Sequence, residues 1–484
     1  MYLKKLHIKN FRCFKDYEVE FAPRVTVLFG KNGAGKSTLI HAIHKAMSFM
    51  MYSYNVTENV KIKGKSKKKV VDVKTIANNN PYLHPKSFAK DDFNNSEDKF
   101  IEVAANANFG ESLNDVDWKI SVIAKNCRLR PSEFEDAFLS FYDWHSNTNE
   151  LPLLAYFSDS FPHREDKKKK TIKAKIASLR NFGYFDWDEE EGCTKEWIER
   201  FERTMRNRDR LERRFRMMND AVHDFGIEKE TEDKAMLLER QMLEMYRNEI
   251  STIETCLINF SKHLGIENSI YNIISLGLHP DDDKLCIITN NENDRYKSFR
   301  KLPAGYKRLL NIVLDLAYRS YILSEGKSCD IKGLAIIDEI DLHLHPELEK
   351  VVLGGFMDTF PNLQFIVSTH SPLVLTRVET EGKPNRILRM NNRDKRLLRN
   401  NDEIEKPVIW PDVYGLDYNT GIEDIMGVSS KNEKLDYLIS LCAYLRNNGM
   451  NKKAKETRDS ILKDFSINEE RLEKLIVEKQ KEQG

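Results

Sequence analysis

The sequence predicts an α/β protein in which buried strands end in glycine-rich and acidic segments. Residues 25–29 are an uninterrupted apolar run, typical of a strand buried on both faces, and they lead directly into a glycine-rich segment at residues 30–37. Residues 333–338 and 364–368 have the same buried-strand pattern. Because helical spacing follows the glycine-rich segment and separates the two later runs, strands and helices alternate as in α/β folds.

The remaining elements follow from local residue patterns. Apolar or alternating stretches predict strands at residues 2–9, 17–21, 100–108, 117–123 and 285–289. Helical spacing predicts helices at residues 38–50, 305–324 and 348–360. Residues 55–98 are rich in lysine and asparagine and are expected to be mostly loop.

A strongly charged, glycine-poor insertion extends from about residue 160 to 265. The composition and length of residues 196–224 and 232–264 predict two long helices, separated by Phe225-Gly-Ile with its helix-ending glycine. Because no clean heptad repeat persists in the second helix, an antiparallel helical hairpin is favoured over a long coiled coil. A solvated spacer is the alternative interpretation.

These patterns divide the chain into four segments. An N-terminal lobe (1–160) precedes the helical arm (161–265), which is followed by a second α/β lobe (266–400) and a helical tail (401–484). The tail is a candidate partner-binding segment, and simple packing against the rest of the protein is its alternative role.

Composition restricts the class of protein. The 77 Lys and Arg residues balance the 76 Asp and Glu residues, so a protein that is polybasic throughout is excluded. Seven scattered cysteines without a C-x-x-C pair fit neither a disulfide framework nor a zinc knuckle, and they suit a reducing cytosol. Neither a signal peptide nor an apolar run of roughly 18 residues is present, so we expect a cytoplasmic protein without a membrane segment.

The glycine-rich segment matches the phosphate-binding P-loop at every defined position, Gly30-x-x-x-x-Gly35-Lys36-Ser37. Its strand–loop–helix setting allows backbone N–H groups to surround phosphate oxygens, with the helix dipole adding to the attraction. Lys36 would reach the β- and γ-phosphates of ATP, and the Ser37 hydroxyl would bind Mg²⁺. The other predicted nucleotide contacts are Asn32, Gly33, Ala34 and Thr38. A glycine turn that binds nothing is the alternative.

The apolar run at residues 334–337 ends in two acids, Asp338 and Glu339. Asp338 can hold the Mg²⁺ ion, and Glu339 can orient or deprotonate the attacking water. His370 ends the next buried strand, where its imidazole could hydrogen-bond the γ-phosphate or merely cap the strand. His343 and His345 form an H-x-H pair, but without a third ligand a structural role is favoured over a metal site.

Together, residues 10–14, 30–37, 338–346 and 368–372 resemble the heads of ABC-type ATPases, in the branch of chromosome-structure proteins, RecF-like repair proteins and OLD nucleases. The resemblance implies a head made of a P-loop lobe and a signature lobe, interrupted by a helical arm. It also implies that two heads sandwich ATP, so that Gly305 contacts the nucleotide of the partner head, and that Arg12 and Asp341 contact nucleotide. Pro303 replaces the signature serine, and Asp92 is the best substitute for the missing Gln-loop residue.

Features of the C-terminal third narrow the choice within that branch. Glu381-Gly-Lys superficially resembles the start of a Toprim nuclease domain, but no D-x-D follows it, and the acidic triplet at residues 281–283 reads as a turn. An intrinsic nuclease is therefore not expected. Residues 409–415 and 422–429 resemble the ATPase subunit of Septu-type anti-phage systems, also found beside some retrons.

That resemblance implies a set of partners. They are a separate HNH nuclease, a second ATPase head in a homodimer or higher oligomer and, in retron versions, a reverse transcriptase with its multicopy single-stranded DNA. The alternative is a RecF-like, ATP-gated DNA-binding protein in repair. Basic stretches at residues 61–69 and 167–175 would suit DNA contact in either case.

Overall fold

The computed structural model describes two compact units, Met1–Tyr414 and Gly415–Gly484. Within them, the described residues are 1–52, 54–62, 65–73, 88–95, 100–123, 129–158, 180–187, 193–225, 234–264, 272–291, 295–390, 404–416, 421, 433–465 and 467–483. The expected basic stretch at 167–175 and the tail segment at 422–429 lie outside these residues.

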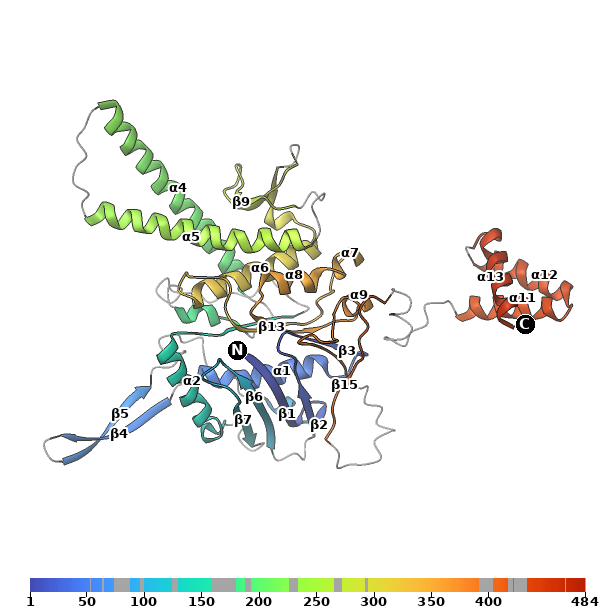
Figure 1. Cartoon of the computed structure of the whole chain (residues 1–484), viewed down its shortest axis with the longest axis horizontal. Coiled ribbons are helices and arrows are strands. Elements are labelled where there is room, and N and C mark those ends of the chain that lie inside the picture. The colour runs from blue at the N-terminus through green and yellow to red at the C-terminus, as the bar shows by residue number, and fades with distance from the viewer. Residues whose placement is uncertain are drawn as a thin grey trace. The chain divides into compact units, whose positions relative to one another are not determined.

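The first unit is built on a six-stranded sheet (Figure 1). Its strands, in spatial order, are β15 (Val408–Ile409), β14 (Asn385–Arg389), β3 (Val25–Phe29), β13 (Leu363–Ser368), β12 (Gly333–Ile337) and β8 (Leu153–Phe157). All neighbouring pairs are parallel except β14 with β15. Each residue of β3, β12 and β13 is buried, which confirms the prediction of strands covered on both faces. The strand β8, which the sequence analysis did not predict, is buried in the same way.

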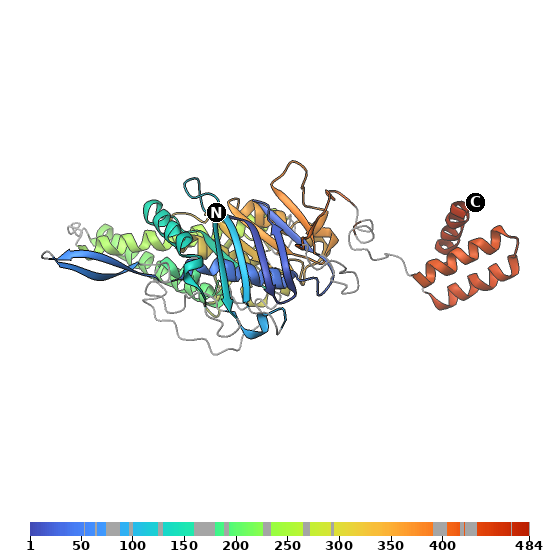
Figure 2. The same cartoon turned by 90° about the horizontal axis from the view of Figure 1, so that it is seen from below.

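A second, antiparallel sheet lies on the other side of helix α1 (Lys36–Met47) (Figure 2). Its order is β2 (Phe14–Glu20), β1 (Tyr2–Phe11), β6 (Phe100–Asn108) and β7 (Val116–Ile123). Trp118 of β7 donates its indole N–H to the carbonyl of Ala46 in α1 at 2.8 Å. Gln364 of β13 exchanges hydrogen bonds with the backbone of Leu3 at 2.8 and 2.9 Å, so the two sheets are joined directly.

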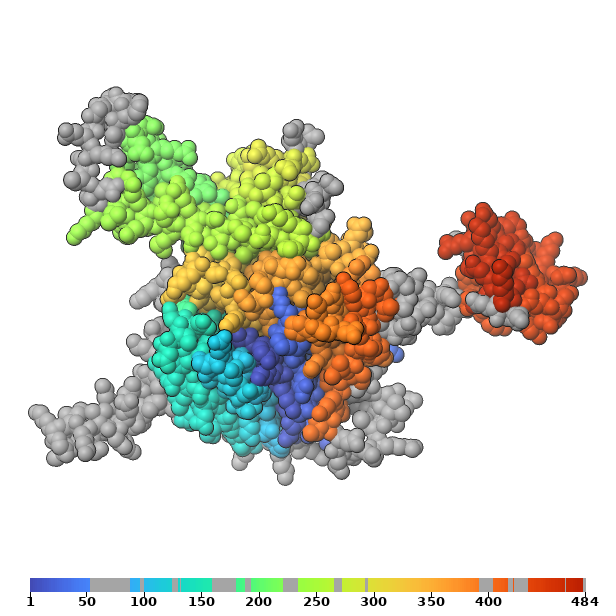
Figure 3. Space-filling model, viewed as in Figure 1, coloured from blue at the N-terminus to red at the C-terminus, as the bar shows by residue number. Residues whose placement is uncertain are grey.

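The predicted helical hairpin is present as α4 (Thr194–Phe225) and α5 (Lys234–His263) (Figures 1 and 3). Its base packs on α6 (Ala304–Leu323) through a stack of Trp197 on Tyr318, with ring centroids 5.3 Å apart. Arg200 and Glu249 join the two arm helices by two 2.8 Å hydrogen bonds. No helix in the described ranges is long and apolar enough to cross a membrane.

Residues 54–73 correct one expectation, because part of the stretch expected to be mostly loop is an antiparallel hairpin of β4 (Tyr54–Ile62) and β5 (Lys65–Val73). The expected helix at 348–360 is also divided, into α7 (Pro346–Glu349) and α8 (Val352–Thr359). The other elements among the described residues of this unit are α2 (Glu135–Thr148), β9 (Ser275–Leu278), β10 (Leu285–Ile288), β11 (Tyr296–Ser298), α9 (Pro372–Leu375) and short 3₁₀ turns at residues 48–51, 90–92, 131–133, 180–184 and 299–301.

The second unit contains α11 (Glu433–Asn447), α12 (Asn451–Asp464) and α13 (Glu469–Gln483). Cys442, Ala443, Ile461, Leu472 and Ile476 are fully buried among the three helices. The Glu473 carboxylate accepts hydrogen bonds from Arg446 and Arg458 at 2.6–2.9 Å, so ion pairs also connect the helices. The second unit therefore has a core of its own. The first residues of the predicted tail, up to Tyr414, belong instead to the first unit, where β15 pairs with β14.

Candidate nucleotide-binding site

The order of the sheet brings three separate sequence motifs to one edge. Strands β3, β13 and β12 are parallel neighbours, with Ser368 opposite Leu28 and Ile337 opposite Val367. Their carboxyl ends therefore place residues 30–37, 368–371 and 338–341 side by side. Ligands of open α/β sheets bind at such an edge.

The loop after β3 has the backbone conformation of a phosphate-binding turn. Gly30, Gly33 and Gly35 all have positive φ angles, of 148°, 81° and 98°. A Cβ atom on Gly30 would lie 2.8 Å from the carbonyl oxygen of Met390, and one on Gly35 would lie 2.8 Å from the Phe14 ring. Because glycine caps the start of α1, no side chain there competes for the helix N–H groups, which remain available to an anion.

Lys36 lies at the centre of this edge. Its ammonium donates to the Gly30 carbonyl at 2.9 Å, so it lies folded back over the loop, and only 8% of the residue is exposed. Burial lowers the pKa of the Lys36 ammonium below its usual value, while the carboxylates of Asp338, Glu339 and Asp341 act in the opposite direction. A buried cation faced by acids is suited to exchange its carbonyl partner for phosphate oxygens.

Two oxygen ligands for a divalent cation converge beside Lys36. The Ser37 hydroxyl donates to the Asp338 carboxylate at 3.1 Å, although the two residues are 301 positions apart. Asp338 is almost fully buried, and its other oxygen accepts a short hydrogen bond from Ser368. Hydroxyl and carboxylate oxygens suit Mg²⁺, which usually retains several waters and needs only one or two protein ligands. The donor set therefore fits the predicted Mg²⁺ site.

Glu339 is held in an uncommon backbone conformation next to these ligands. Its φ angle is 51°, in the left-handed region that costs a residue with a side chain of the order of 1 kcal/mol. Its N–H group donates to the Ser368 hydroxyl at 2.8 Å, which fixes the turn at the end of β12. Strain of this kind concentrates where a side chain must be aimed at a ligand.

Asp341 contacts the end of β13. Its carboxylate accepts the Thr369 hydroxyl at 2.5 Å and the His370 N–H at 3.3 and 3.4 Å. His370 itself is exposed, two residues after the end of β13. Its predicted contact with the γ-phosphate remains a prediction. Asp341 was predicted to contact nucleotide, and the geometry adds that it connects the segment after Glu339 to the segment carrying His370.

The remaining predicted residues lie at the same loop or at its borders. Asn32 and Gly33 are exposed, Ala34 is buried, and Thr38 in the first turn of α1 is half-buried. His343 and His345 are both exposed, and Nδ1 of His345 accepts the Glu347 N–H at 3.3 Å as a helix cap. That contact favours the structural role for His345.

Arg12 and Asp92 contact each other. The guanidinium of Arg12 donates to the Asp92 carboxylate at 2.8 Å, and Lys45 of α1 lies 3.7 Å from the same carboxylate. Burial alone would raise the pKa of Asp92, but the Ala89 N–H and the Arg12 guanidinium outweigh it and lower that pKa. A buried, ion-paired Asp92 would have to exchange these partners before it could serve as a Gln-loop substitute.

Gly305 lies near the start of α6, for which Pro303 is the N-cap residue. A Cβ atom on Gly305 would approach the His343 carbonyl to 2.6 Å, so glycine is required here by a close approach within the same chain. The predicted contact of Gly305 with the nucleotide of a second head remains a prediction.

Sequence reasoning did not assign two residues that position the acids. Ser368 bridges Asp338 and Glu339, as described above, and Arg308 is fully buried beneath them. The Arg308 guanidinium donates to the carbonyls of Asp338 at 2.9 Å, and of Ile340 and Ser158 at 3.4 Å. The sequence carries only a weak signal for Arg308, because the largely apolar helix at residues 305–324 also contains the charged residues Lys307, Asp315 and Arg319.

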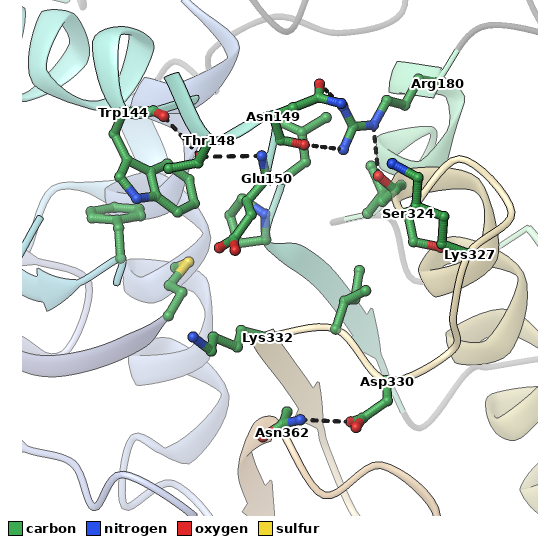
Figure 4. A pocket seen from close by; sticks show the side chains of 16 residues that line it. Trp144, Thr148, Asn149, Glu150, Arg180, Ser324, Lys327, Asp330, Lys332 and Asn362 are labelled. Carbon is green, nitrogen blue, oxygen red and sulfur yellow. Dashed lines mark hydrogen bonds between the residues drawn. The ribbon is translucent and has the colours of Figure 1, made fainter. Parts of the chain in front are cut away.

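A cavity of about 300 Å³ lies at the opposite edge of the sheet, where β8 and β12 begin (Figure 4). Many polar groups on its wall bind each other. Arg180 donates to Asn149 and to the Leu323 carbonyl at 2.6–2.7 Å, and Asn362 donates to Asp330 at 2.9 Å. We therefore place the chemistry at the P-loop edge.

The bridge formed by Ser368 leads to a testable expectation. Ser368→Ala removes one donor to Asp338 and the acceptor that holds the Glu339 N–H, so we expect ATP turnover to fall about 10- to 100-fold, which corresponds to a loss of about 1.4–2.7 kcal/mol. Steady-state phosphate release measures this effect. Thr359→Ala is the matched control, because the Thr359 hydroxyl only contacts a carbonyl of its own helix. Equal turnover in the two variants would show that Ser368 does not position the acids.

Comparison with known proteins shows the family of most of the chain. The AAA ATPase domain family matches residues 1–375. Retron Vc95 probable ATPase of Vibrio cholerae serotype O1 biovar El Tor is 26% identical over 426 residues, which are 78% of this chain and 72% of that protein. Septu protein PtuA of Bacillus thuringiensis is 28% identical over 143 residues, or 29% of this chain and 35% of that protein.

Among solved structures, the crystal structure of the SmcHead bound to the C-winged helix domain of ScpA aligns with 88% of this chain and 100% of that chain, at 15% identity and a TM-score of 0.42. The resemblance to retron-associated and Septu-type ATPases is confirmed by the two sequence relatives. Since the family match extends over most of the sequence and includes every predicted nucleotide-site residue, the chain belongs to the AAA ATPase domain family.

Proposed function

We propose that this chain binds and hydrolyses ATP as the regulatory subunit of a bacterial anti-phage defence complex, in which it controls a separate HNH-type nuclease. The observation that supports the ATPase part is the convergence of Lys36, Ser37 and Asp338 at one edge of the sheet. Similarity to a retron probable ATPase over 426 residues supports the defence role.

Each residue of the site has a defined task in this proposal. ATP, when bound with Mg²⁺, supplies the phosphoanhydride bond that is hydrolysed. Lys36 neutralises charge on the β- and γ-phosphates, and Ser37 and Asp338 hold the ion. Glu339 accepts the proton of the attacking water, and His370 donates a hydrogen bond toward the γ-phosphate.

The regulatory step requires two heads. In the proposed homodimer, or higher oligomer, Gly305 of one copy contacts the nucleotide held by Lys36 of the other, in addition to its role within its own chain. Nucleotide would then favour the closed pair of heads by differential affinity for the closed and open states. The base of the arm would transmit that difference. Trp197 and Arg200 of the arm pack on Tyr318 of α6, the helix that carries Gly305 in its first turn.

The proposal assigns the cleavage of nucleic acid to a partner of this chain. Among the described residues, no group of three His, Cys, Asp or Glu side chains is arranged to hold a metal ion. The Mg²⁺ ion of the ATP site is proposed to need only two protein ligands, Ser37 and Asp338. Similarity to a retron probable ATPase and to a Septu protein supports a multi-component system, in which a second protein cleaves nucleic acid. A reverse transcriptase and its multicopy single-stranded DNA are further partners where the system is a retron.

Co-purification from the native genomic neighbourhood tests this function. We expect a nuclease to co-purify with the full chain, and co-expression of the two to protect cells from phage infection. Protection should be lost in Lys36→Ala while the two proteins still co-purify. ATP-dependent retention of this chain on DNA, without a bound nuclease and without protection from phage, would instead support the RecF-like alternative.

A further inference from the structure

Glu349 is an acid to which the proposed ATPase site gives no task. It is the last residue of α7, and its side chain is half-buried, whereas Glu347 of the same helix is exposed. The Glu349 carboxylate accepts a short hydrogen bond from the Ser371 hydroxyl, which joins α7 to the start of α9. Ser371 directly follows His370 in the chain. The contact therefore reaches the segment that carries the predicted γ-phosphate donor.

Both chain neighbours of His370 are tied to carboxylates. Thr369, before it, donates its hydroxyl to Asp341 at 2.5 Å, and Ser371, after it, donates its hydroxyl to Glu349. The Ser371 N–H also donates to the Thr369 hydroxyl at 2.9 Å. Thr369 and Ser371 are buried, and His370 between them is exposed. The backbone is thus anchored on each side of His370, while its imidazole stays open to a ligand.

Capping of α9 explains Ser371 but does not explain Glu349. The Ser371 hydroxyl oxygen accepts the Leu373 N–H at 3.1 Å, as expected of an N-cap residue. That bond uses a lone pair of the oxygen and leaves the hydroxyl proton to be donated. A water molecule could accept this proton at no cost in buried charge. The use of a half-buried carboxylate in its place indicates a function for a rigid contact.

The surroundings of Glu349 disfavour its charge. Burial raises the pKa of the Glu349 carboxyl above its usual value, the Ser371 hydroxyl acts in the opposite direction, and the Asp341 carboxylate adds to the increase. An acid placed where burial and a like charge oppose ionisation is more common at functional sites than elsewhere. Here the acid lies one hydrogen bond away from the segment of His370.

We propose that Glu349 is a positioning residue for ATP hydrolysis, which acts through Ser371 to hold His370 beside the γ-phosphate. It does not touch the nucleotide. Asp341 fixes the segment before His370 and Glu349 fixes the segment after it, so the imidazole needs little reorganisation when ATP binds. This inference rests on the ATPase part of the proposed function and is independent of the control of a nuclease.

The test compares steady-state ATP hydrolysis of full-length variants, with ATP affinity measured by calorimetry. Glu349→Ala should lower kcat about tenfold, and should leave KM and ATP affinity within about twofold of the unchanged protein, because the lost hydrogen bond acts on the reacting state. Glu349→Gln retains an acceptor oxygen and should recover most of the rate. The matched control is Glu347→Ala, which removes an exposed acid of the same helix and should keep the full rate.

A double-mutant cycle with His370→Ala distinguishes positioning from general stabilisation. If Glu349 acts through His370, adding Glu349→Ala to His370→Ala should change kcat by less than about twofold. Ser371→Ala removes the same hydrogen bond from its donor end and should show the same coupling, which keeps the test decisive if Glu349→Ala does not fold.

Two results would overturn this role of Glu349 alone. One is a kcat of Glu349→Ala equal to that of Glu347→Ala, and the other is a double variant in which the two losses multiply. Absence of turnover in the unchanged protein would instead contradict the ATPase part of the proposed function, and the role of Glu349 would fall with it.

Discussion

Lys36→Ala is expected to reduce ATP binding below detection by isothermal titration calorimetry. Lys36 is the buried cation of the loop, and its ammonium faces Asp338, Glu339 and Asp341. Its removal costs a charge-assisted hydrogen bond and leaves the β- and γ-phosphates without a counter-charge. Such a loss corresponds to about two orders of magnitude in affinity.

The control for this variant lies in the same loop. Lys31→Ala also removes one positive charge, but the Lys31 side chain is exposed. The turn that begins at Lys31 is closed by a backbone hydrogen bond, in which the Ala34 N–H donates to the Lys31 carbonyl at 3.1 Å. The control should bind ATP within about threefold of the unchanged protein, which is a difference below 1 kcal/mol. Unchanged affinity in Lys36→Ala would refute the assignment of the P-loop.

Glu339→Gln is expected to bind ATP normally and to hydrolyse it about 10²- to 10⁴-fold more slowly, the usual contribution of a general base. The substitution keeps the shape of the side chain and removes the carboxylate. The backbone of residue 339 should keep its φ angle of 51°, because its N–H still donates to Ser368. Calorimetry and phosphate release separate the two effects.

Glu347→Gln provides the same chemical change on α7, where the side chain is exposed. It should leave both ATP binding and turnover unchanged. If Glu339→Gln turned over ATP at the rate of this control, another group would have to accept the proton. His370, at the end of the neighbouring strand, would then be the next candidate.

Some parts of the site could be predicted from the sequence because they are formed by residues that are consecutive in the chain. A glycine loop between a buried strand and a helix is visible in consecutive residues, as is the pair of acids that ends β12. The long arm helices were also predictable, because composition alone distinguishes them from their surroundings. The hairpin at residues 54–73 was missed because its many lysines were taken as a sign of a loop.

The supporting contacts could not be predicted, because they join residues that are far apart in the chain. Ser37 and Asp338 are separated by 301 positions, and Arg12 and Asp92 by 80. The distance between two such segments along the sequence does not show which of their residues are neighbours in space. That information comes from the order of the strands in the sheet.

We propose that this chain regulates the cleavage of nucleic acid and does not itself cleave it. The most direct test is to incubate the purified full chain with plasmid, single-stranded DNA and RNA. Each incubation contains Mg²⁺ or Mn²⁺ and is done with and without ATP. We predict phosphate release from ATP and no cut in any nucleic acid. The acidic triplet at residues 281–283 lies in a turn between β9 and β10, where the Asp283 N–H donates to the His279 carbonyl at 3.0 Å. Cleavage that persists through purification and disappears in Asp281→Ala or Asp283→Ala would contradict the claim and identify this chain as a nuclease.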